Sequence, residues 1–330
     1  MINVFVDARS ACLDRLTGWE RYASSLLREL KDDSTTTWNL WQPTRGTVSS
    51  ASARVKQDLW DVPRRCRFSD VLFFPTYPPA REYPAPTLWT LHDLTWLRHP
   101  EWASPLGRTY YRRLAARRLS GSTHVVTVSD AVRAELLDAG LATDRVTRVY
   151  PGLSSHLVEL GSVSPPPLDR PFVLCVGTAE PRKNLGTLAR AWSTSDLRIR
   201  YDLVLVGRLG WAELPAGIRH VDRPGDEELA RLYRTASALV LPSLYEGFGL
   251  PLVEALQFGL PVACSDIPVF REVTDGHAHF FDPLDEADMV KAIGAAIGDG
   301  RQAPPHDVLA RYRWQSAAGE LGDLVARLCG

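Results

Sequence analysis

The chain has 330 residues, 45% of them hydrophobic and 23% charged, with a formal net charge of −1. This composition is typical of a soluble globular protein of about two domains, and the near-neutral balance gives no sign of a nucleic-acid partner. No run of about 18 apolar residues occurs, and the N-terminal sequence M-I-N-V-F-V-D-A-R meets charge too early for a signal peptide, so we expect a cytoplasmic protein.

The first half of the chain alternates short apolar strands with helical patterns, which predicts a doubly wound α/β domain over residues 1–160. The predicted strands are Ile2–Asp7, Trp38–Trp41, Val71–Phe74, Thr87–Leu91, His124–Val128 and Val146–Tyr150. The predicted helices are Trp19–Leu30, Leu106–Leu119 and Asp130–Asp138, with an uncertain helical stretch at Val48–Asp61.

A proline- and serine-rich stretch without period, residues 161–171, is predicted to be an interdomain linker. The strand and helix alternation then restarts over residues 172–310, which predicts a second Rossmann-like domain. Its predicted strands are Phe172–Val176, Leu203–Val206, Arg219–Val221, Ala238–Leu241, Val262–Cys264 and His279–Phe281. Its predicted helices are Leu185–Trp192, Asp226–Thr235, Leu252–Phe258 and Glu286–Ile297, and a last helix follows at Trp314–Leu328.

Charge is distributed unevenly along the chain. Residues 1–150 hold 21 Lys and Arg against 16 Asp and Glu, whereas residues 151–330 hold 17 against 23. The excess comes largely from one predicted helix with the residues Arg108, Arg112, Arg113, Arg117 and Arg118. Such spacing usually forms a solvated helix face, and the alternative is peripheral contact with an anionic membrane or a polyprenyl-diphosphate acceptor.

The most informative segment is S-L-Y-E-G-F-G-L-P-L-V-E-A, Ser243 to Ala255, which joins a predicted strand to a predicted helix. Gly247 and Gly249 allow a sharp turn there, and a proline in the first helical turn is tolerated. The N–H groups at the start of the predicted helix, around Phe248 to Leu250, together with the helix dipole, are expected to form an anion site. A phosphate is therefore the expected ligand of this turn.

Two carboxylates flank the turn. Glu246 precedes it and could accept hydrogen bonds from hexose hydroxyls, while Glu254 in the first helical turn could accept from a pair of ribose hydroxyls. The alternative is that Glu246 is a solvated loop residue and that Glu254 merely favours the helix dipole, worth about 0.3–1 kcal/mol.

This segment resembles the signature of the retaining nucleotide-sugar glycosyltransferases of family 4, with its two glutamates at Glu246 and Glu254. Three further motifs are similar to that family in the expected order. They are D-A-R at Asp7–Arg9 with T-G-W-E-R-Y at Thr17–Tyr22, L-H-D-L at Leu91–Leu94, and G-T-A-E-P-R-K-N-L at Gly177–Leu185. The resemblance implies a GT-B fold, two Rossmann-like domains facing across a cleft, with residues 311–330 crossing back to the N-terminal domain.

In this family the basic residues after the first strand of the C-terminal domain grip the donor diphosphate, which assigns that role to Arg182 and Lys183. Their cations would stabilise the charge that builds on the departing diphosphate; the alternative is an ordinary surface helix start. Thr178 stands where one common form of the family has an arginine, and Arg182 could substitute for it.

The resemblance places His92 and Asp93 beside the donor sugar. His92 would bind a sugar hydroxyl or steady the oxocarbenium ion, and Asp93 would orient the acceptor or the histidine, although a histidine at a strand end is more often structural. Gly18 would approach the diphosphate or the acceptor. The bulky Trp19 follows it, at a position where the family often has a further glycine.

The nucleobase is expected near the loop Val221–Pro224, where Val221 and Arg223 would contact the donor. We expect no metal and no cofactor, because no Asp-x-Asp triplet is present and helix dipole plus basic side chains can replace the cation. The five cysteines are widely spaced and odd in number, which argues against a disulfide framework or a zinc site.

The predicted function is retaining transfer of a hexose from a nucleotide diphosphate sugar, with GDP-mannose weakly favoured, to a polysaccharide, lipid-linked or natural-product acceptor. Front-side displacement is favoured because no carboxylate nucleophile is evident. The alternatives are a sugar-nucleotide epimerase or glycosyl phosphorylase of the same architecture, and a non-catalytic nucleotide-sugar binder. A Rossmann oxidoreductase is disfavoured because neither half has Gly-x-Gly-x-x-Gly after its first strand.

Overall fold

The computed structural model describes residues 1–12, 18–32, 34–43, 51–103, 107–153, 155–160, 168–210 and 214–330. The chain divides into two compact units. The first comprises Met1–Gly152 and Tyr312–Gly330, and the second comprises Leu153–Arg311. Most of the predicted linker, residues 161–167, lies outside the described residues.

The first unit is built on a six-stranded parallel sheet with the order β2-β1-β3-β4-β5-β6. Its strands are β1 (Ile2–Asp7), β2 (Thr36–Trp41), β3 (Val71–Phe74), β4 (Thr87–Leu91), β5 (His124–Thr127) and β6 (Val146–Arg148). All residues of β3, β4 and β5 are buried, as expected for central parallel strands covered by helices on both faces.

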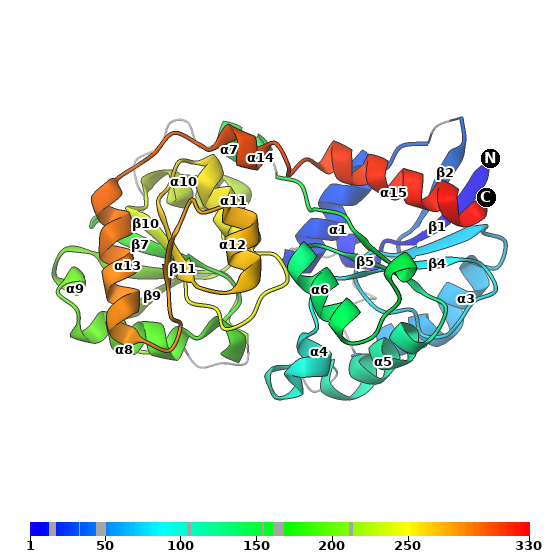
Figure 1. Cartoon of the computed structure of the whole chain (residues 1–330), viewed down its shortest axis with the longest axis horizontal. Helices are drawn as coiled ribbons and strands as arrows, with labels where there is room; N and C mark the ends of the chain where they lie inside the picture. The colour runs from blue at the N-terminus through cyan, green and yellow to red at the C-terminus, as the bar shows by residue number, and fades with distance from the viewer. Residues whose placement is uncertain are drawn as a thin grey trace. The chain divides into compact units, whose positions relative to one another are not determined.

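Helices cover both faces of this first sheet. The longer ones are α1 (Gly18–Glu29), α5 (Arg112–Ser120), α6 (Asp130–Asp138) and α15 (Trp314–Cys329). Figure 1 shows α1 and α15 on one side of the sheet and α5 on the other. The C-terminal helix α15 packs against α1, where Trp314 meets Tyr22 edge to face with ring centroids 5.5 Å apart.

Shorter helical segments complete the first unit. They are η1 (Arg9–Cys12), α2 (Ala51–Lys56), η2 (Gln57–Asp61), α3 (Val62–Arg65), α4 (Thr95–Arg98), η3 (Pro100–Trp102), η4 (Gly107–Tyr111) and η5 (Thr143–Arg145). The predicted helix over residues 106–119 is thus split into η4 and α5, and its first residue lies outside the described part of the chain.

The second unit repeats the architecture with a parallel sheet ordered β12-β11-β10-β7-β8-β9. Its strands are β7 (Phe172–Val176), β8 (Asp202–Val206), β9 (Ile218–Val221), β10 (Ala238–Leu241), β11 (Val262–Ser265) and β12 (His279–Phe281). This is the strand order of the dinucleotide-binding Rossmann fold, and the predicted pair of Rossmann-like domains is confirmed.

Helices also cover both faces of the second sheet. They are α7 (Ser155–Leu160), η6 (Pro181–Lys183), α8 (Leu185–Thr194), α9 (Leu197–Arg200), α10 (Asp226–Thr235), α11 (Leu250–Gln257), α12 (Pro268–Thr274), α13 (Glu286–Asp299) and α14 (His306–Leu309). Within this unit α8 packs against α13, and α11 packs against α12 (Figure 1).

One sequence expectation changes in the folded chain. Arg118 is buried and lies 3.8 Å from Glu82, so it does not belong to the solvated face that was predicted for the arginine-rich helix; Arg112, Arg113 and Arg117 are exposed. Cys175 and Cys264 are buried in strands, as expected of core residues. No helix in the described ranges is both long enough and apolar enough to cross a membrane.

Candidate functional site

The candidate site of the second unit lies where the strand order reverses. From β7 the chain continues to β8 on one side, while β10 pairs with β7 on the other. The loops that leave the carboxyl ends of these two strands therefore meet, and ligands of open α/β sheets bind at such a point. A backbone hydrogen bond joins the two loops, because Leu244 N–H donates to the Arg182 carbonyl across 2.8 Å.

The carboxylate of Glu246 is the centre of this meeting point. Its Oε2 accepts from Nη1 of Arg182 at 2.5 Å, and its Oε1 accepts both from Nζ of Lys183 and from the Ser243 hydroxyl at 2.8 Å. Glu246 itself is only 8% exposed. The two predicted phosphate-binding cations are thus in direct contact with the predicted sugar-binding carboxylate.

Arg182 has a second acidic partner. Its Nε donates to Oε2 of Glu180 at 2.9 Å, and its Nη1 also lies 3.3 Å from the carbonyl oxygen of Tyr245. Two carboxylates and two cations therefore form one compact, charge-balanced cluster. Such a cluster holds both basic side chains in fixed positions, which is the preorganisation that electrostatic catalysis requires.

The environment keeps Glu246 ionised. Burial by itself raises the pKa of this carboxyl, but the neighbouring positive charges of Arg182 and Lys183 outweigh burial and lower the pKa to about 2. The carboxylate is consequently charged at every pH at which the protein is expected to work.

Glycines bring the backbone close enough to build this corner. A Cβ at Gly177 would lie 3.2 Å from Cε of Lys183, so the lysine side chain packs directly over this glycine. A Cβ at Gly210 would lie 2.9 Å from Cγ2 of Thr178 and 2.4 Å from the Ala179 carbonyl. Thr178 is therefore packed against the loop that follows β8.

The predicted anion-binding turn has the expected conformation. Gly249 adopts a positive φ of 101° and immediately precedes α11, which begins at Leu250. Phe248 is buried, and Gly247 precedes it in the turn. A side chain at Gly249 would also meet the Phe270 ring at 2.9 Å, so both conformation and space require glycine here.

Glu254 lies within α11 and is buried, at 8% exposure. Its Oε2 accepts a hydrogen bond of 2.6 Å from the hydroxyl of Tyr233, a fully buried residue of α10.

The predicted base-binding loop follows β9. There Val221 O accepts from Gly207 N–H at 3.0 Å, and Arg223 has a positive φ of 42° and pairs with its neighbour Asp222.

In the first unit, His92 follows β4 and is 7% exposed. Its Nε2 lies 2.9 Å from the Pro75 carbonyl, which can only accept, so Nε2 carries the proton and Nδ1 is an acceptor in the neutral ring. The ring stacks on Trp19 at 5.4 Å and meets Tyr22 edge to face at 4.6 Å. Burial lowers the pKa of His92 to about 4, against smaller opposing effects of the Pro75 carbonyl and Asp93.

Asp93 is buried and accepts from the N–H of Thr95 at 2.9 Å, rather than from the ring of His92. Asp93 therefore acts on the His92 ring through its charge and not through a hydrogen bond, and its predicted role of orienting the acceptor or the histidine stays a prediction. Gly18 begins α1 and is exposed, and no described atom lies within 4 Å of where its Cβ would be. Packing among the described residues thus does not require glycine at this position.

A buried ion-pair network lies beyond β1 in the same unit. Arg9 donates from Nε to Asp7 at 2.8 Å and from Nη2 to Asp58 at 2.7 Å, and the Tyr110 hydroxyl donates to Asp58 at 3.1 Å. Burial lowers the pKa of Arg9, but the two carboxylates outweigh it and the net pKa is raised. The D-A-R motif therefore anchors the β1 loop to η2.

Sequence reasoning assigned no role to three residues that the folded chain places in the site, Glu180, Ser243 and Tyr233. Glu180 and Ser243 lie within the quoted motifs, which was the available signal for them. Tyr233 had no such signal, since an aromatic residue on the inner face of an amphipathic helix is usually a core residue.

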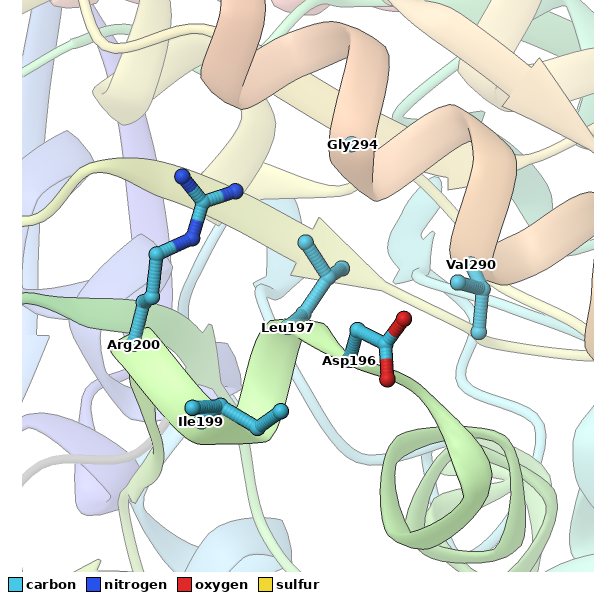
Figure 2. A pocket seen from close by; sticks show the side chains of 6 residues that line it. All are labelled: Asp196, Leu197, Ile199, Arg200, Val290 and Gly294. Atoms are coloured by element: carbon cyan, nitrogen blue, oxygen red, sulfur yellow. The ribbon is translucent and has the colours of Figure 1, made fainter.

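Over the described ranges, neither a metal-binding cluster nor the pocket of the second unit adds to this site. Among the described residues no group of three His, Cys, Asp or Glu side chains is placed to hold a metal ion. Figure 2 shows a pocket between α9 and α13 whose lining residues are Asp196, Leu197, Ile199, Arg200, Val290 and Gly294. None of the predicted site residues lines this pocket.

Comparison with known families decides the relationship. Residues 161–308 match the family of glycosyl transferases group 1, and residues 54–156 match Glycosyltransferase Family 4. Both matched models are glycosyltransferase families, one over most of the second unit and the other over residues 54–156. The predicted family resemblance is confirmed.

Bacterial relatives of the chain include two proteins named as O-antigen chain mannosyltransferases, and the chain spans only part of the length of each. O-antigen chain mannosyltransferase B of Escherichia coli is 31% identical over 229 residues, which are 63% of this chain and 59% of that protein. O-antigen chain mannosyltransferase RfbU of Salmonella typhimurium is 29% identical over 258 residues, 72% of this chain and 68% of that protein.

Solved structures show what fold the chain shares with known proteins. Sucrose-phosphate synthase from Thermosynechococcus elongatus matches with a TM-score of 0.76 and 18% identity, covering 99% of both chains. This level of identity supports the predicted GT-B fold alone, and it says nothing about the substrate.

Proposed function

We propose that the chain transfers a hexose, with mannose favoured, from a nucleotide diphosphate sugar to an acceptor hydroxyl with retention of anomeric configuration. The observation that carries this proposal is the contact of Arg182 and Lys183 with Glu246 at the switch point of the second sheet. Mannose is favoured because the two O-antigen relatives are named mannosyltransferases.

Arg182 and Lys183 bind the diphosphate and stabilise the negative charge that forms when the bond to the anomeric carbon breaks. The N–H groups at the start of α11, next to Gly247, Phe248 and Gly249, add the positive end of a helix dipole. Together these groups supply what a divalent cation would otherwise supply, so we propose a metal-independent reaction. Activity that persists in excess EDTA would support this point.

Glu246 has two functions in this proposal. It holds both cations by ion pairs, and the remaining acceptor capacity of Oε2 binds a hydroxyl of the donor hexose. Because its carboxylate is engaged by two cations, Glu246 is a poor nucleophile. Front-side displacement, in which the leaving phosphate takes the proton of the acceptor, fits this arrangement better than a covalent intermediate.

The remaining residues bind the other parts of the substrates. Glu254 binds the ribose hydroxyls, while Thr178, Val221 and Arg223 contact the diphosphate and the base. In the first unit the neutral His92 accepts from a sugar hydroxyl through Nδ1, and Gly18 leaves room for substrate. Asp93 shapes the loop after β4 through its bond to Thr95.

Incubation with GDP-mannose and octyl α-D-mannopyranoside, followed by chromatography, tests the proposal. Transfer yields free GDP and a disaccharide glycoside, and α-configured product demonstrates retention. UDP-glucose, dTDP-glucose and ADP-glucose run in parallel identify the donor. An epimerase would leave the nucleotide bonded to an altered sugar, a phosphorylase would need inorganic phosphate, and a binder would show a thermal shift without product; each of these results would refute transfer.

The acceptor is proposed to be a glycan, a lipid-linked glycan or a glycosylated natural product, with peripheral contact to an anionic membrane through the first unit. Trp60 and Phe68 are 56% and 80% exposed, and Leu59 is exposed beside them. The guanidinium groups of Arg64 and Arg67 lie over the Trp60 and Phe68 rings at 5.9 and 4.3 Å. Exposed aromatic side chains next to arginines suit the boundary between anionic headgroups and acyl chains.

Cosedimentation with phosphatidylglycerol-containing vesicles tests this contact. Replacing both Trp60 and Phe68 by Ser should reduce binding at least about fivefold, whereas Leu284→Ser, an exposed residue of the second unit, should leave it unchanged. Equal binding to pure phosphatidylcholine vesicles, or no effect of the double variant, would refute membrane contact through this surface.

A further inference from the structure

The hydrogen bond between Tyr233 and Glu254 joins two helices of the second unit. Tyr233 lies near the end of α10 and is fully buried, and Glu254 lies 21 residues later in α11. The donor and acceptor atoms are 2.6 Å apart. A tyrosine hydroxyl is the donor here because an ionised carboxylate can only accept.

Tyr233 is itself held firmly. Its ring stacks on Phe258, with centroids 5.5 Å apart and planes within 12°. Arg301 donates to the Tyr233 carbonyl at 2.7 Å, to the Ala236 carbonyl at 2.9 Å and to the Phe258 carbonyl at 3.0 Å. Arg301 thus ties the end of α10 to the end of α11, which fixes the position of the tyrosine hydroxyl relative to α11.

Glu254 depends on that hydroxyl for its orientation. Within the described part of the chain, Tyr233 is the only side chain that donates a hydrogen bond to the Glu254 carboxylate. A glutamate has several rotatable bonds, and immobilising such a side chain when a ligand binds reduces the affinity for that ligand. A side chain already held in the unliganded protein avoids that cost.

We propose that Tyr233 is a positioning residue that presets Glu254 to accept from the vicinal hydroxyls of the donor ribose. The inference rests on the proposed role of Glu254 in binding the donor nucleotide. Oε2 accepts from Tyr233 with one lone pair, which leaves Oε1 and the second lone pair of Oε2 as acceptors for the two ribose hydroxyls. The Tyr233–Glu254 pair therefore gives the protein its preference for ribonucleotides over deoxyribonucleotides.

Calorimetric titration tests the inference. The ligands are GDP, 2′-deoxy-GDP and 3′-deoxy-GDP, together with the corresponding uridine nucleotides. The wild-type protein should bind the better ribonucleotide at least about tenfold more tightly than its deoxy analogues. Tyr233→Phe keeps the ring packing on Phe258 and removes only the hydroxyl. In this variant the preference should fall to about threefold or less, with the affinity for the deoxy analogues unchanged.

Two further variants make the result specific. Glu254→Ala should abolish the preference, and adding Tyr233→Phe to it should change nothing more. Tyr201→Phe, which removes a tyrosine hydroxyl elsewhere in the same unit, should keep the full wild-type preference.

The inference would be overturned by equal losses of affinity for ribo- and deoxyribonucleotides in Tyr233→Phe, which would indicate a purely structural tyrosine. It would also be overturned if wild type showed no preference, or if Glu254→Ala retained it. In these cases sugar transfer by the wild-type enzyme would still stand. Loss of transfer with every donor would instead refute the proposed function while leaving the nucleotide preference measurable.

Discussion

Arg182 donates from Nη1 to Oε2 of Glu246 across 2.5 Å, although the two residues lie 64 positions apart in the chain. The contact exists because β7 and β10 are neighbours in the sheet, which brings their following loops together. Lys183 bonds to the other oxygen of the same carboxylate. The cluster therefore carries its own counter-charge, and in the proposed function a donor diphosphate shares these cations with Glu246.

Replacing Glu246 by Gln should make the protein more dependent on its ligand. The variant leaves two partly buried cations without their shared carboxylate, and unpaired buried charge is destabilising. We expect a lower melting temperature without ligand and a larger increase on adding GDP than in wild type, because the diphosphate replaces the missing charge. Thermal denaturation at matched GDP concentrations measures both, and equal increases in the two proteins would contradict the charge-sharing arrangement.

The buried ring of His92 should make stability fall in mild acid. Its pKa is about 4 in the folded chain against 6.5 in the unfolded chain, so the unfolded chain binds the proton more readily. The free energy of unfolding should therefore decrease as pH falls from about 6.5 toward 4, by on the order of 3 kcal/mol.

Urea denaturation at pH 7 and pH 4 compares wild type with His92→Gln, which keeps a donor for the Pro75 carbonyl but does not titrate. Between these pH values the free energy of unfolding should fall less in the variant than in wild type, by on the order of 3 kcal/mol. If the free energy of unfolding changed equally with pH in both proteins, the pKa of His92 would not be lowered in the folded chain. The acid loss due to Glu246 is separable, because its depressed pKa places that loss between about 4.5 and 2.

Gly18→Ala should separate function from stability. The added methyl group meets no described atom within 4 Å, and alanine is a better helix former than glycine by up to about 1 kcal/mol. We expect an unchanged or slightly raised melting temperature, together with at least about a tenfold loss of transfer if substrate approaches this backbone. Full activity in the variant would remove Gly18 from the site.

Gly207→Ala is the opposite case. Gly207 has a φ of 140°, and its Cβ would lie 2.3 Å from the Gly177 carbonyl oxygen. The substitution should lower the free energy of unfolding by at least about 1–3 kcal/mol, measured by urea denaturation. A variant as stable as wild type would show that the loops after β7 and β8 are less closely packed than described.

The strands were predictable because buried parallel strands appear as continuous apolar runs, and Val71–Phe74 and Phe172–Val176 were placed correctly at both ends. The helices Ser155–Leu160 and Pro268–Thr274 were missed, since helices this short show too few turns for a period to emerge. Arg118 is buried, and its Nη1 lies 3.8 Å from Oε1 of Glu82. No local sequence pattern indicates this tertiary neighbour.

Motifs identified Arg182, Lys183 and Glu246 as site candidates, but not that they bind one another. Each motif was interpreted through the ligand group it resembles, and side-chain pairing across loops depends on strand order and rotamers. The tyrosine that orients Glu254 was missed for a related reason, because Tyr233 has the same spacing as a core residue of α10.

The central claim is that Lys183 stabilises the departing diphosphate. Its most direct test is the rate at which Lys183→Ala consumes GDP-mannose with octyl α-D-mannopyranoside as acceptor. Arg190→Ala is the matched control, since the exposed Arg190 side chain pairs with Glu286 and donates to Thr187 in the same unit, and Arg190 is not one of the predicted site residues. The account predicts at least about a 100-fold loss for Lys183→Ala, about 2.7 kcal/mol of transition-state stabilisation, and a near wild-type rate for Arg190→Ala. A folded Lys183→Ala protein that kept the wild-type rate would contradict it.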